Sequence, residues 1–270
     1  MHPSIERKKP NKYEIITREQ LKKLPKPEWL IKRTIEAAEI SMIFGAPGSG
    51  KTFIALDMCL CIASGLPWMG NKAQKRSVLY TFGEGASGVE DRVAAWEEAN
   101  NTPVNDNIHF LATTPKLNDK GEFEELCSAI DELENNPSLI VIDTLSRAIA
   151  GSEENSAKEM SVVVEICGFL QKKYKAAVLL VHHSSKKSDT ARGSSTIEGA
   201  ANTMIYVKKN KGKPGVISCE KQKNSGEFTE IEFKLAPIGP EEDSSCVVQK
   251  IEKDNHHMVI ASNARLTTNQ

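Results

Sequence analysis

A glycine-rich octapeptide constrains this chain more than any other feature of its sequence. It reads Gly45-Ala46-Pro47-Gly48-Ser49-Gly50-Lys51-Thr52, follows the apolar run Ile40–Phe44, and precedes a predicted helix over Lys51–Ala63. The pattern GxxxxGK followed by Ser or Thr, set between a strand and a helix, is highly specific for a phosphate-binding loop. A chance glycine-rich turn is the weaker interpretation, because every required position and both flanking elements match.

Each residue type in this loop has a chemical function in phosphate binding. Glycines let the backbone wrap tightly, so that several N–H groups point at one phosphate, and the helix N-terminus adds the positive end of its dipole. Lys51 supplies an ammonium for the phosphates, and Thr52 supplies a hydroxyl for Mg²⁺. The sequence therefore predicts that residues 45–52 bind a nucleotide, taken to be ATP, together with Mg²⁺.

Short apolar strands alternate with helices on both sides of this loop. Runs rich in Val, Ile and Leu between helical segments are typical of a parallel sheet covered by helices on both faces. The expected strands are Ile40–Phe44, Ser77–Phe82, Ile108–Leu111, Leu139–Ile142 and Ala177–Val181, and the helices that follow are Lys51–Ala63, Val89–Asn100, Phe123–Leu133 and Lys158–Tyr174. The pattern predicts one α/β domain.

The pattern changes after Asn202, where strands follow one another with only turns between them. These strands are expected at Thr203–Val207, Val216–Lys221, Phe228–Leu235, Val247–Ile251 and Met258–Ala261. They suggest antiparallel additions to the edge of the sheet. We divide the chain into a basic arm (1–27) with at most one short helix at Arg18–Leu24, a domain (28–262) and a tail (263–270).

The composition excludes several other classes of protein. The chain has 270 residues, of which 39% are hydrophobic and 26% charged, as in ordinary globular proteins. Its longest apolar runs, Met58–Ala63 and Ala176–Val181, are far shorter than the roughly 20 residues of a membrane helix. The N-terminus lacks an apolar signal segment, and six scattered cysteines suggest buried thiols. We expect a cytoplasmic protein with no membrane partner.

The formal net charge of −1 hides an uneven distribution. Residues 1–33 hold ten Lys/Arg against four Glu, so the remainder carries a net charge of −7. Such asymmetry hints at contact with a polyanion, but a solvated basic tail is the explanation that we favour.

Polar residues follow three of the predicted strands. Asp143 ends the buried run Leu139–Ile142, where a carboxylate is costly unless it is paired or holds a metal, so it is the candidate Walker B residue. Glu84 follows the strand ending at Phe82 and is the candidate base for an attacking water, a loop carboxylate being the alternative. Carboxyl ends of parallel strands share one edge, where α/β sheets place ligands.

His182-His183 closes the strand Ala177–Val181. Neighbouring side chains on a strand point to opposite faces, so one histidine is expected to face the γ-phosphate while the other packs. The same alternation disfavours a zinc pair.

These residues resemble those of RecA-like ATPases and, among them, the RepA-type hexameric replicative helicases of plasmids and phages. The resemblance covers about Trp29 to Leu235. Beyond Gly45–Thr52 it includes Gly65–Gly70, Val78–Gly85, Ile142–Arg147, His182-His183, Arg192-Gly193-Ser194-Ser195 and Cys219–Lys223. It implies a RecA-like core in a ring or filament, with ATP bound between the subunits of a homo-oligomer, expected to be a hexamer.

The resemblance also implies roles for individual residues. Lys51 and Thr52 would contact phosphate and Mg²⁺, Asp143 would join the Mg²⁺ shell, Glu84 would be the base, and His182 or His183 would sense the γ-phosphate. RepA-type relatives carry a trans-acting arginine at a position that is Asn202 in this chain, so the chain departs from that pattern. Lys221 and Lys223 resemble the Lys-x-Arg pair of other replicative helicases and are our candidate trans cations; solvated strand lysines are the alternative.

Single-stranded DNA is the partner that the resemblance implies. The segment Ser184–Thr196, with Lys186, Lys187 and Arg192, resembles the central-channel loop of relatives, whereas Gly151–Lys158 is rich in Glu and suits an interface. Few aromatic residues are available for stacking, so binding is expected to be electrostatic and indifferent to sequence. A solvated loop with no ligand is the alternative.

Three functions fit these features. The first is an ATP-driven helicase for phage or plasmid replication, working with other replication proteins. The second is a recombination mediator or DNA-binding ATP switch that forms filaments. The third is a P-loop kinase or signalling ATPase, which we disfavour because Glu84, expected on a strand beside the P-loop strand, supplies a base that a kinase acceptor does not need.

Overall fold

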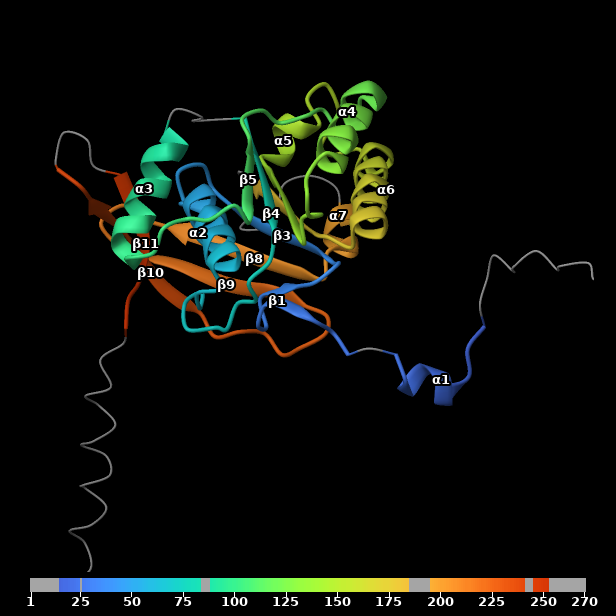
Figure 1. Ribbon diagram of the computed structural model, residues 1–270, viewed down its shortest axis with the longest axis horizontal. Helices are drawn as coiled ribbons and strands as arrows, with labels where there is room; N and C mark the ends of the chain where they lie inside the picture. The colour runs from blue at the N-terminus through green and yellow to red at the C-terminus, as the bar shows by residue number, and fades with distance from the viewer. Residues whose placement is uncertain (1–14, 25, 84–87, 185–194, 241–244, 253–270) are drawn as a thin grey trace, which may run out of the picture.

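A nine-stranded sheet runs through the molecule in the order β11-β10-β9-β8-β3-β7-β6-β4-β5 (Figure 1). The computed structural model describes residues 15–24, 26–83, 88–184, 195–240 and 245–252. Strands β8 to β5 pair in parallel, and β9, β10 and β11 continue from β8 as antiparallel additions. The predicted fold class, a RecA-like core with antiparallel strands at the C-terminal side, is confirmed.

The elements follow the expected alternation closely. The strands of the large sheet are β3 (Ile40–Gly45), β4 (Val78–Phe82), β5 (Ile108–Leu111), β6 (Leu139–Asp143), β7 (Ala177–His183), β8 (Thr203–Lys209), β9 (Gly215–Gln222), β10 (Ile231–Ile238) and β11 (Ser245–Lys250). The helices are α1 (Arg18–Lys22), α2 (Lys51–Ser64), α3 (Val89–Asn100), α4 (Lys120–Asp131), α5 (Leu145–Ala148), α6 (Ala157–Tyr174) and α7 (Ser195–Ala200). A small separate sheet pairs β1 (Trp29–Ile31) with β2 (Ile35–Glu36).

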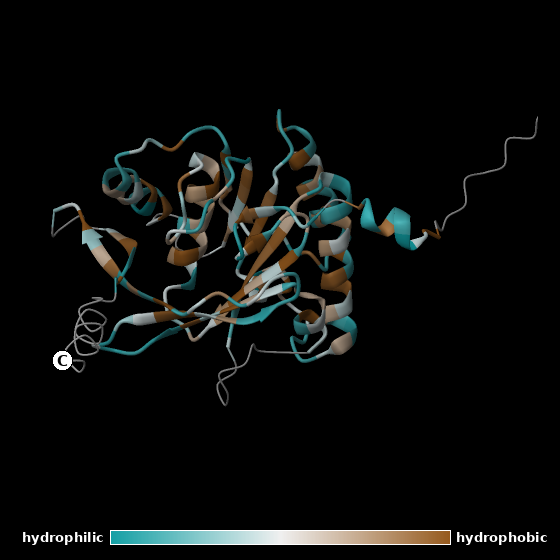
Figure 2. Ribbon diagram, turned by 90° about the horizontal axis from the view of Figure 1, so that it is seen from below, coloured by the Kyte–Doolittle hydropathy of each residue, from teal (hydrophilic) through white to brown (hydrophobic). Residues whose placement is uncertain are grey.

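Helices cover both faces of the sheet, and the strands supply a separate hydrophobic core to each. On β7, for example, Leu179 and Val181 face the core shared with α2 and α3, whereas Val178 and Leu180 face the core shared with α4, α5, α6 and α7. The central strands are therefore apolar on both sides, as in other buried parallel sheets, and appear brown in Figure 2.

Several details differ from the predicted pattern. The short elements β1, β2, α5 and α7 were not expected, and β10 begins at Ile231 because Phe228 packs against the core from a loop instead of a strand. The prediction that Glu84 follows a strand beside the P-loop strand is wrong. Strands β7 and β6 lie between β3 and β4, since later segments of the chain insert there. The predicted strand Met258–Ala261 and the tail lie outside the described residues.

All six cysteines are free thiols; four are buried, as expected, whereas Cys219 and Cys246 are only half-buried. Among the residues that the structure describes, no helix is both long enough and apolar enough to span a bilayer.

Candidate nucleotide-binding site

The P-loop joins the end of β3 to the start of α2, and the structure requires glycine at three of its positions. A Cβ on Gly45 would lie 2.2 Å from the carbonyl oxygen of Val207 on the neighbouring strand β8. Gly48 and Gly50 have φ values of 75° and 98°, in the left-handed region that disfavours side chains. Gly50 is also the N-cap of α2 and offers no side-chain cap, so the first N–H groups of the helix face the loop.

Lys51 is almost fully buried beneath this loop, with 5% of its surface exposed. Its Nζ donates hydrogen bonds to the carbonyl oxygens of Gly45 at 3.0 Å and Ala46 at 2.8 Å. These bonds fix the ammonium at the base of the loop. A buried cation is costly, and the negative charge of a phosphate would offset that cost.

A cavity of about 380 Å³ lies over the loop. Its lining residues come from the loop, from α2 and α3, from the ends of β6 and β7, and from β10; they are Pro47, Gly48, Gly50, Lys51, Thr52, Phe53, Arg92, Thr144, His183 and Leu235. Two larger hollows, of about 470 and 530 Å³, lie against the β10–β11 hairpin and contain none of these residues.

The polar groups at this cavity fit a nucleotide with Mg²⁺. Within the described part of the chain, the hydroxyls of Ser49 and Thr144 are buried and have no hydrogen-bond partner. Buried hydroxyls usually have partners, so the Thr144 hydroxyl, which lines the cavity, is available to an added ligand. The hard oxygen donors Thr52 and Asp143 suit Mg²⁺, while the loop N–H groups and Lys51 suit phosphate.

Asp143 ends β6 and is buried, with 4% of its surface exposed. It shares the side of β6 that faces α2, because Leu139 and Val141 belong to that core. The hydroxyl of Tyr80 on β4 donates to Asp143 Oδ2 at 2.7 Å. Burial and the neighbouring carboxylate raise the pKa of Tyr80 well above its ordinary value, so its hydroxyl remains a donor. Tyr80 therefore holds the carboxylate in place, a role that the sequence did not reveal.

The junction after β4 is tightly packed. A Cβ on Gly83 would lie 2.5 Å from Thr114 Oγ1 and 2.8 Å from Arg147 Cδ. The N–H of Gly83 and the hydroxyl of Thr114 both donate to the carbonyl oxygen of Asp143, at 3.1 and 3.2 Å. Strand β4 thus ends beside Asp143, at the expected edge, but Glu84 itself lies outside the described residues.

The two histidines at the end of β7 occupy different environments. His183 lines the cavity and pairs in register with Gly45 at the end of β3. His182 is 1% exposed and shares the side of β7 occupied by Val178 and Leu180. Of the pair, His183 is therefore the residue placed to meet a phosphate.

Lys221, near the end of β9, and Lys223, just after it, reach toward α7 of the same chain. Lys221 Nζ donates to the carbonyl oxygens of Glu198 and Gly199, and Lys223 Nζ donates to that of Ala200 at 3.3 Å. Burial and the adjacent Lys223 lower the pKa of Lys221. Both lysines therefore cap the C-terminal end of α7, a contact that the sequence did not predict. Asn202 is buried between α7 and β8, and its N–H donates to the carbonyl oxygen of Ile40.

Arg92 is a site residue that the sequence did not indicate. It comes from α3, lines the cavity, and places its guanidinium 4.7 Å from the centroid of the Phe53 ring. This stacking fixes a cation beside the loop, and no acidic side chain among the described residues forms an ion pair with it. Its position, eight residues after Glu84, was only a weak indication that Arg92 belongs to the site, because the orientation of α3 depends on tertiary packing.

The candidate DNA residues Lys186, Lys187 and Arg192 lie outside the described residues. Helix α7 already begins at Ser195, so the predicted loop Ser184–Thr196 is shorter than expected at its C-terminal end.

Comparison with known proteins gives one result at the level of the family. A family model described as AAA domain matches residues 7–189, which is more than half of the chain. The matched region contains the P-loop, Tyr80, Arg92, Asp143 and both histidines. The search of curated proteins returned no match.

Proposed function

The chain belongs to the AAA domain family of P-loop ATPases, and from this premise we propose that it couples ATP hydrolysis to movement along single-stranded DNA. The observation that carries the ATPase part of the proposal is the convergence of Lys51, Thr52, Arg92, Thr144 and His183 on one cavity, and the movement on DNA rests on the resemblance to the RepA-type helicases. A parallel sheet brings these groups from distant segments to its carboxyl edge, where α/β proteins bind ligands.

In the proposed reaction, the residues of this chain position the phosphates and the attacking water. Loop N–H groups and Lys51 hold the β- and γ-phosphates, and Arg92 and His183 contact the γ-phosphate side. Thr52 and Asp143 would hold Mg²⁺, which would neutralise part of the phosphate charge when bound. Glu84 accepts a proton from the water, since it follows the strand that ends beside Asp143.

We propose that the working form is a ring of identical subunits, a hexamer by resemblance to the RepA-type helicases. Lys221 and Lys223 would act on a neighbour's phosphates. Each ammonium has three N–H donors, so their bonds to α7 leave room for a phosphate oxygen. Lysine would serve as a point charge in this role, without the planar bidentate contact of arginine.

The proposed DNA contacts are Lys186, Lys187 and Arg192, the basic residues of the segment that leads into α7. Because α7 is held by Lys221 and Lys223, this arrangement links the DNA segment to residues proposed to sense a neighbour's nucleotide. Such a link is what a translocating motor requires.

The test is unwinding of a forked duplex by the purified protein with ATP, with Lys51→Ala as the inactive control. We expect strand displacement and an ATPase rate that rises when single-stranded DNA is added. No displacement, together with an ATPase rate indifferent to DNA, would overturn the proposal. Helical filaments on DNA in electron micrographs, in place of closed rings, would instead favour the ATP switch.

A further inference from the structure

Two side-chain contacts join helix α2 to helix α3, about one helical turn apart on each (Figure 1). The Arg92 guanidinium lies over the Phe53 ring, and the indole N–H of Trp96 donates to Asp57 Oδ1 at 2.9 Å. Phe53 and Asp57 are four residues apart on α2, as are Arg92 and Trp96 on α3. Residues at this spacing share one face of a helix, so the two contacts form a ladder between helices that run in the same direction.

The contact between Asp57 and Trp96 gives this ladder its direction. Trp96 is buried, and the other buried side chains of α3 are those of Val89, Val93 and Ala95. Apolar packing is non-directional, so by itself it allows α3 to slide or turn against its neighbours. A hydrogen bond has a preferred length and angle, and the bond to Asp57 therefore fixes where α3 lies on α2.

Strand β11 closes one side of the ladder against water. A gap of about 10 Å³ separates the four ladder side chains from Cys246, Val247 and Val248 of β11. This space is no larger than the smallest one that holds a single water, so solvent on this side does not compete for the Trp96 indole N–H. A hydrogen bond in such surroundings is stronger than in water, and a buried donor that lost its acceptor would be costly.

The other contact of the ladder places a cation in the nucleotide site. Arg92 and Phe53 both line the cavity over the P-loop. The face of one aromatic ring holds a guanidinium at a given height but leaves it free to shift sideways, so the position of the charge follows the position of α3. A displacement of about 1 Å at a reacting group can lower a rate about 100-fold. The bond that fixes α3 on α2 thus bears on the chemistry of the site.

We propose that Asp57 is a positioning residue for ATP hydrolysis, which holds Arg92 over the P-loop through its hydrogen bond to Trp96. Asp57 touches neither the phosphates nor the attacking water; it acts through α3. The inference rests on the part of the proposed function in which Arg92 contacts the γ-phosphate side, and it requires no binding of DNA.

The test is steady-state ATPase kinetics of variants of the full chain. Asp57→Leu keeps a similar shape but offers no acceptor to Trp96, so we expect kcat/KM for ATP to fall about 10-fold, as for the loss of one charged hydrogen bond. The affinity for a fluorescent ADP analogue should stay at the wild-type value, because ADP lacks the γ-phosphate that Arg92 is proposed to contact. Asp57→Asn keeps an acceptor oxygen and should restore most of the rate.

A double variant separates positioning from a general effect on the fold. If Asp57 acts through Arg92, then Asp57→Leu should change kcat/KM by less than about twofold when Arg92→Met is already present, since sites that act as one unit are not additive. A residue that only stabilises the domain would cause the same loss in both backgrounds.

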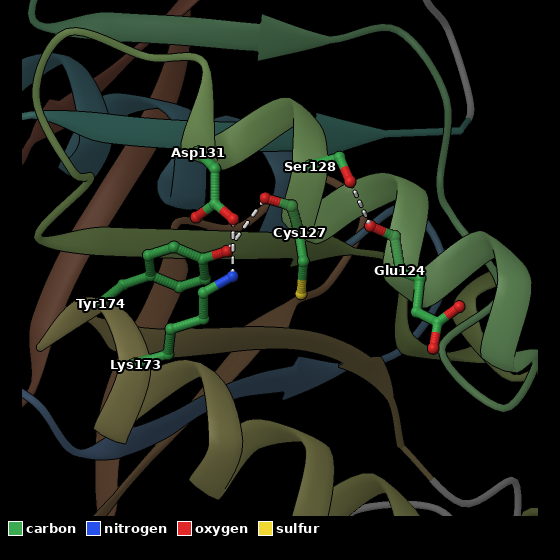
Figure 3. Close-up of polar contacts among 6 residues, drawn as sticks. All are labelled: Glu124, Cys127, Ser128, Asp131, Lys173 and Tyr174. Carbon is green, nitrogen blue, oxygen red and sulfur yellow. Dashed lines mark hydrogen bonds and ion pairs between the residues drawn. The ribbon is translucent and has the colours of Figure 1, made fainter.

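The matched control is another hydrogen bond between two helices, away from the cavity (Figure 3). The Tyr174 hydroxyl on α6 donates to the carbonyl oxygen of Cys127 on α4 at 3.0 Å. Tyr174→Phe removes that donor and should leave kcat/KM unchanged. Trp96→Phe likewise removes a donor and keeps an aromatic ring, but it should repeat the loss caused by Asp57→Leu.

Three results would overturn the inference: a wild-type rate in both Asp57→Leu and Trp96→Phe, weakened ADP binding in step with the lost rate, or equal losses with and without Arg92→Met. Should Asp57→Leu not fold, Trp96→Phe carries the same expectations. A wild-type protein that hydrolyses ATP without unwinding DNA would remove the motor and leave the role of Asp57 intact. One that hydrolyses no ATP would remove both the ATPase and this role.

Discussion

At the scale of single residues, the charged side chains of the site are held in place by hydrogen bonds within the chain. Lys51 donates to the carbonyl oxygens of Gly45 and Ala46, and Asp143 accepts from Tyr80. Bonds of this kind place charged groups before a ligand binds, which favours rapid chemistry because little reorganisation remains.

Replacing Glu84 tests the proposed base. Glu84→Gln keeps the size and polarity of the side chain but cannot accept a proton, so we expect ATP turnover to fall at least 100-fold, in line with general-base contributions of about 10²–10⁴. Binding of a fluorescent ATP analogue should remain near the wild-type affinity. Turnover at the wild-type rate would remove Glu84 from this role.

Replacing Arg92 should lower ATP turnover without lowering the stability of the fold. Arg92→Met keeps the apolar contact with Phe53 but removes the charge, so we expect kcat/KM for ATP to fall about 10-fold or more, as for loss of one charged hydrogen bond. Arg76→Met is the matched control, because Arg76 pairs with Glu28 at the surface. Equal effects of the two substitutions would contradict a role for Arg92 at the site.

Asp57 on α2 makes stability depend on pH. Burial raises its pKa to about 7, even though Trp96 Nε1 donates to its carboxylate at 2.9 Å, which acts in the other direction. A carboxyl with a raised pKa favours the folded state fully at about pH 4 and loses that contribution as pH rises toward 7. Between pH 5 and 8, the free energy of unfolding should therefore fall about 2–3 kcal/mol more in the wild type than in Asp57→Asn. Urea titrations at both values measure the difference, and parallel losses would contradict it.

The site residues that belong to a local sequence pattern could be predicted, whereas those that depend on tertiary packing could not. Lys51 and Thr52 lie in one octapeptide, and Asp143 ends one buried strand. Tyr80 meets Asp143 only because β4 and β6 pair across 63 residues, and Arg92 reaches the cavity only through the orientation of α3. Neither contact has a signature in a single sequence.

At the scale of elements, the strands and long helices were predictable because each carries its own hydrophobic period. Helix α3 and strand β5 have the predicted bounds, and most other ends differ by a few residues. The strand order was not predictable, since pairing between distant segments leaves no local trace; this is why β4 was wrongly expected beside β3. Helices α5 and α7 have four and six residues and are too short to show a period.

The close contact between β3 and β8 predicts that one methyl group added at Gly45 strongly destabilises the fold. Gly45→Ala would place Cβ 2.2 Å from the carbonyl oxygen of Val207, so the strands must separate locally. We expect the free energy of unfolding in urea to fall by about 2 kcal/mol or more. Gly168→Ala is the control, because a Cβ at that helical position meets no atom within 4 Å and should stabilise α6 slightly. Similar losses for both variants would mean that the close approach of Val207 to Gly45 is not the cause.

At the scale of the whole molecule, net charge is a poor guide to partners. The value of −1 combines a basic arm with an acidic remainder, and the segment from Lys208 to Lys223 alone holds six lysines and one glutamate. The local distribution of charge is therefore a better guide than the net charge to where a charged partner would bind.

Binding to single-stranded DNA should depend strongly on salt. If Lys186, Lys187 and Arg192 each neutralise one phosphate, the dependence for single strands predicts about a 20-fold loss of affinity per subunit between 50 and 200 mM salt. Oligonucleotides of different sequence should bind alike, because few aromatic residues are present to stack on bases. Fluorescence anisotropy measures both, and an affinity insensitive to salt would contradict the electrostatic contact.

The antiparallel strands after α7 have a consequence for where this protein can be divided. The family match ends at residue 189, yet β8 pairs with β3 from Ser41 to Gly45, Leu235 of β10 lines the cavity, and Phe233 packs beside Gly50. A fragment ending at the match would leave β3 as a bare edge strand with apolar side chains on both faces, which invites aggregation. The segment that matches the family model is thus shorter than the segment that the fold needs. Strands β8 and β10 must also be present before the P-loop strand β3 is paired on both sides and covered.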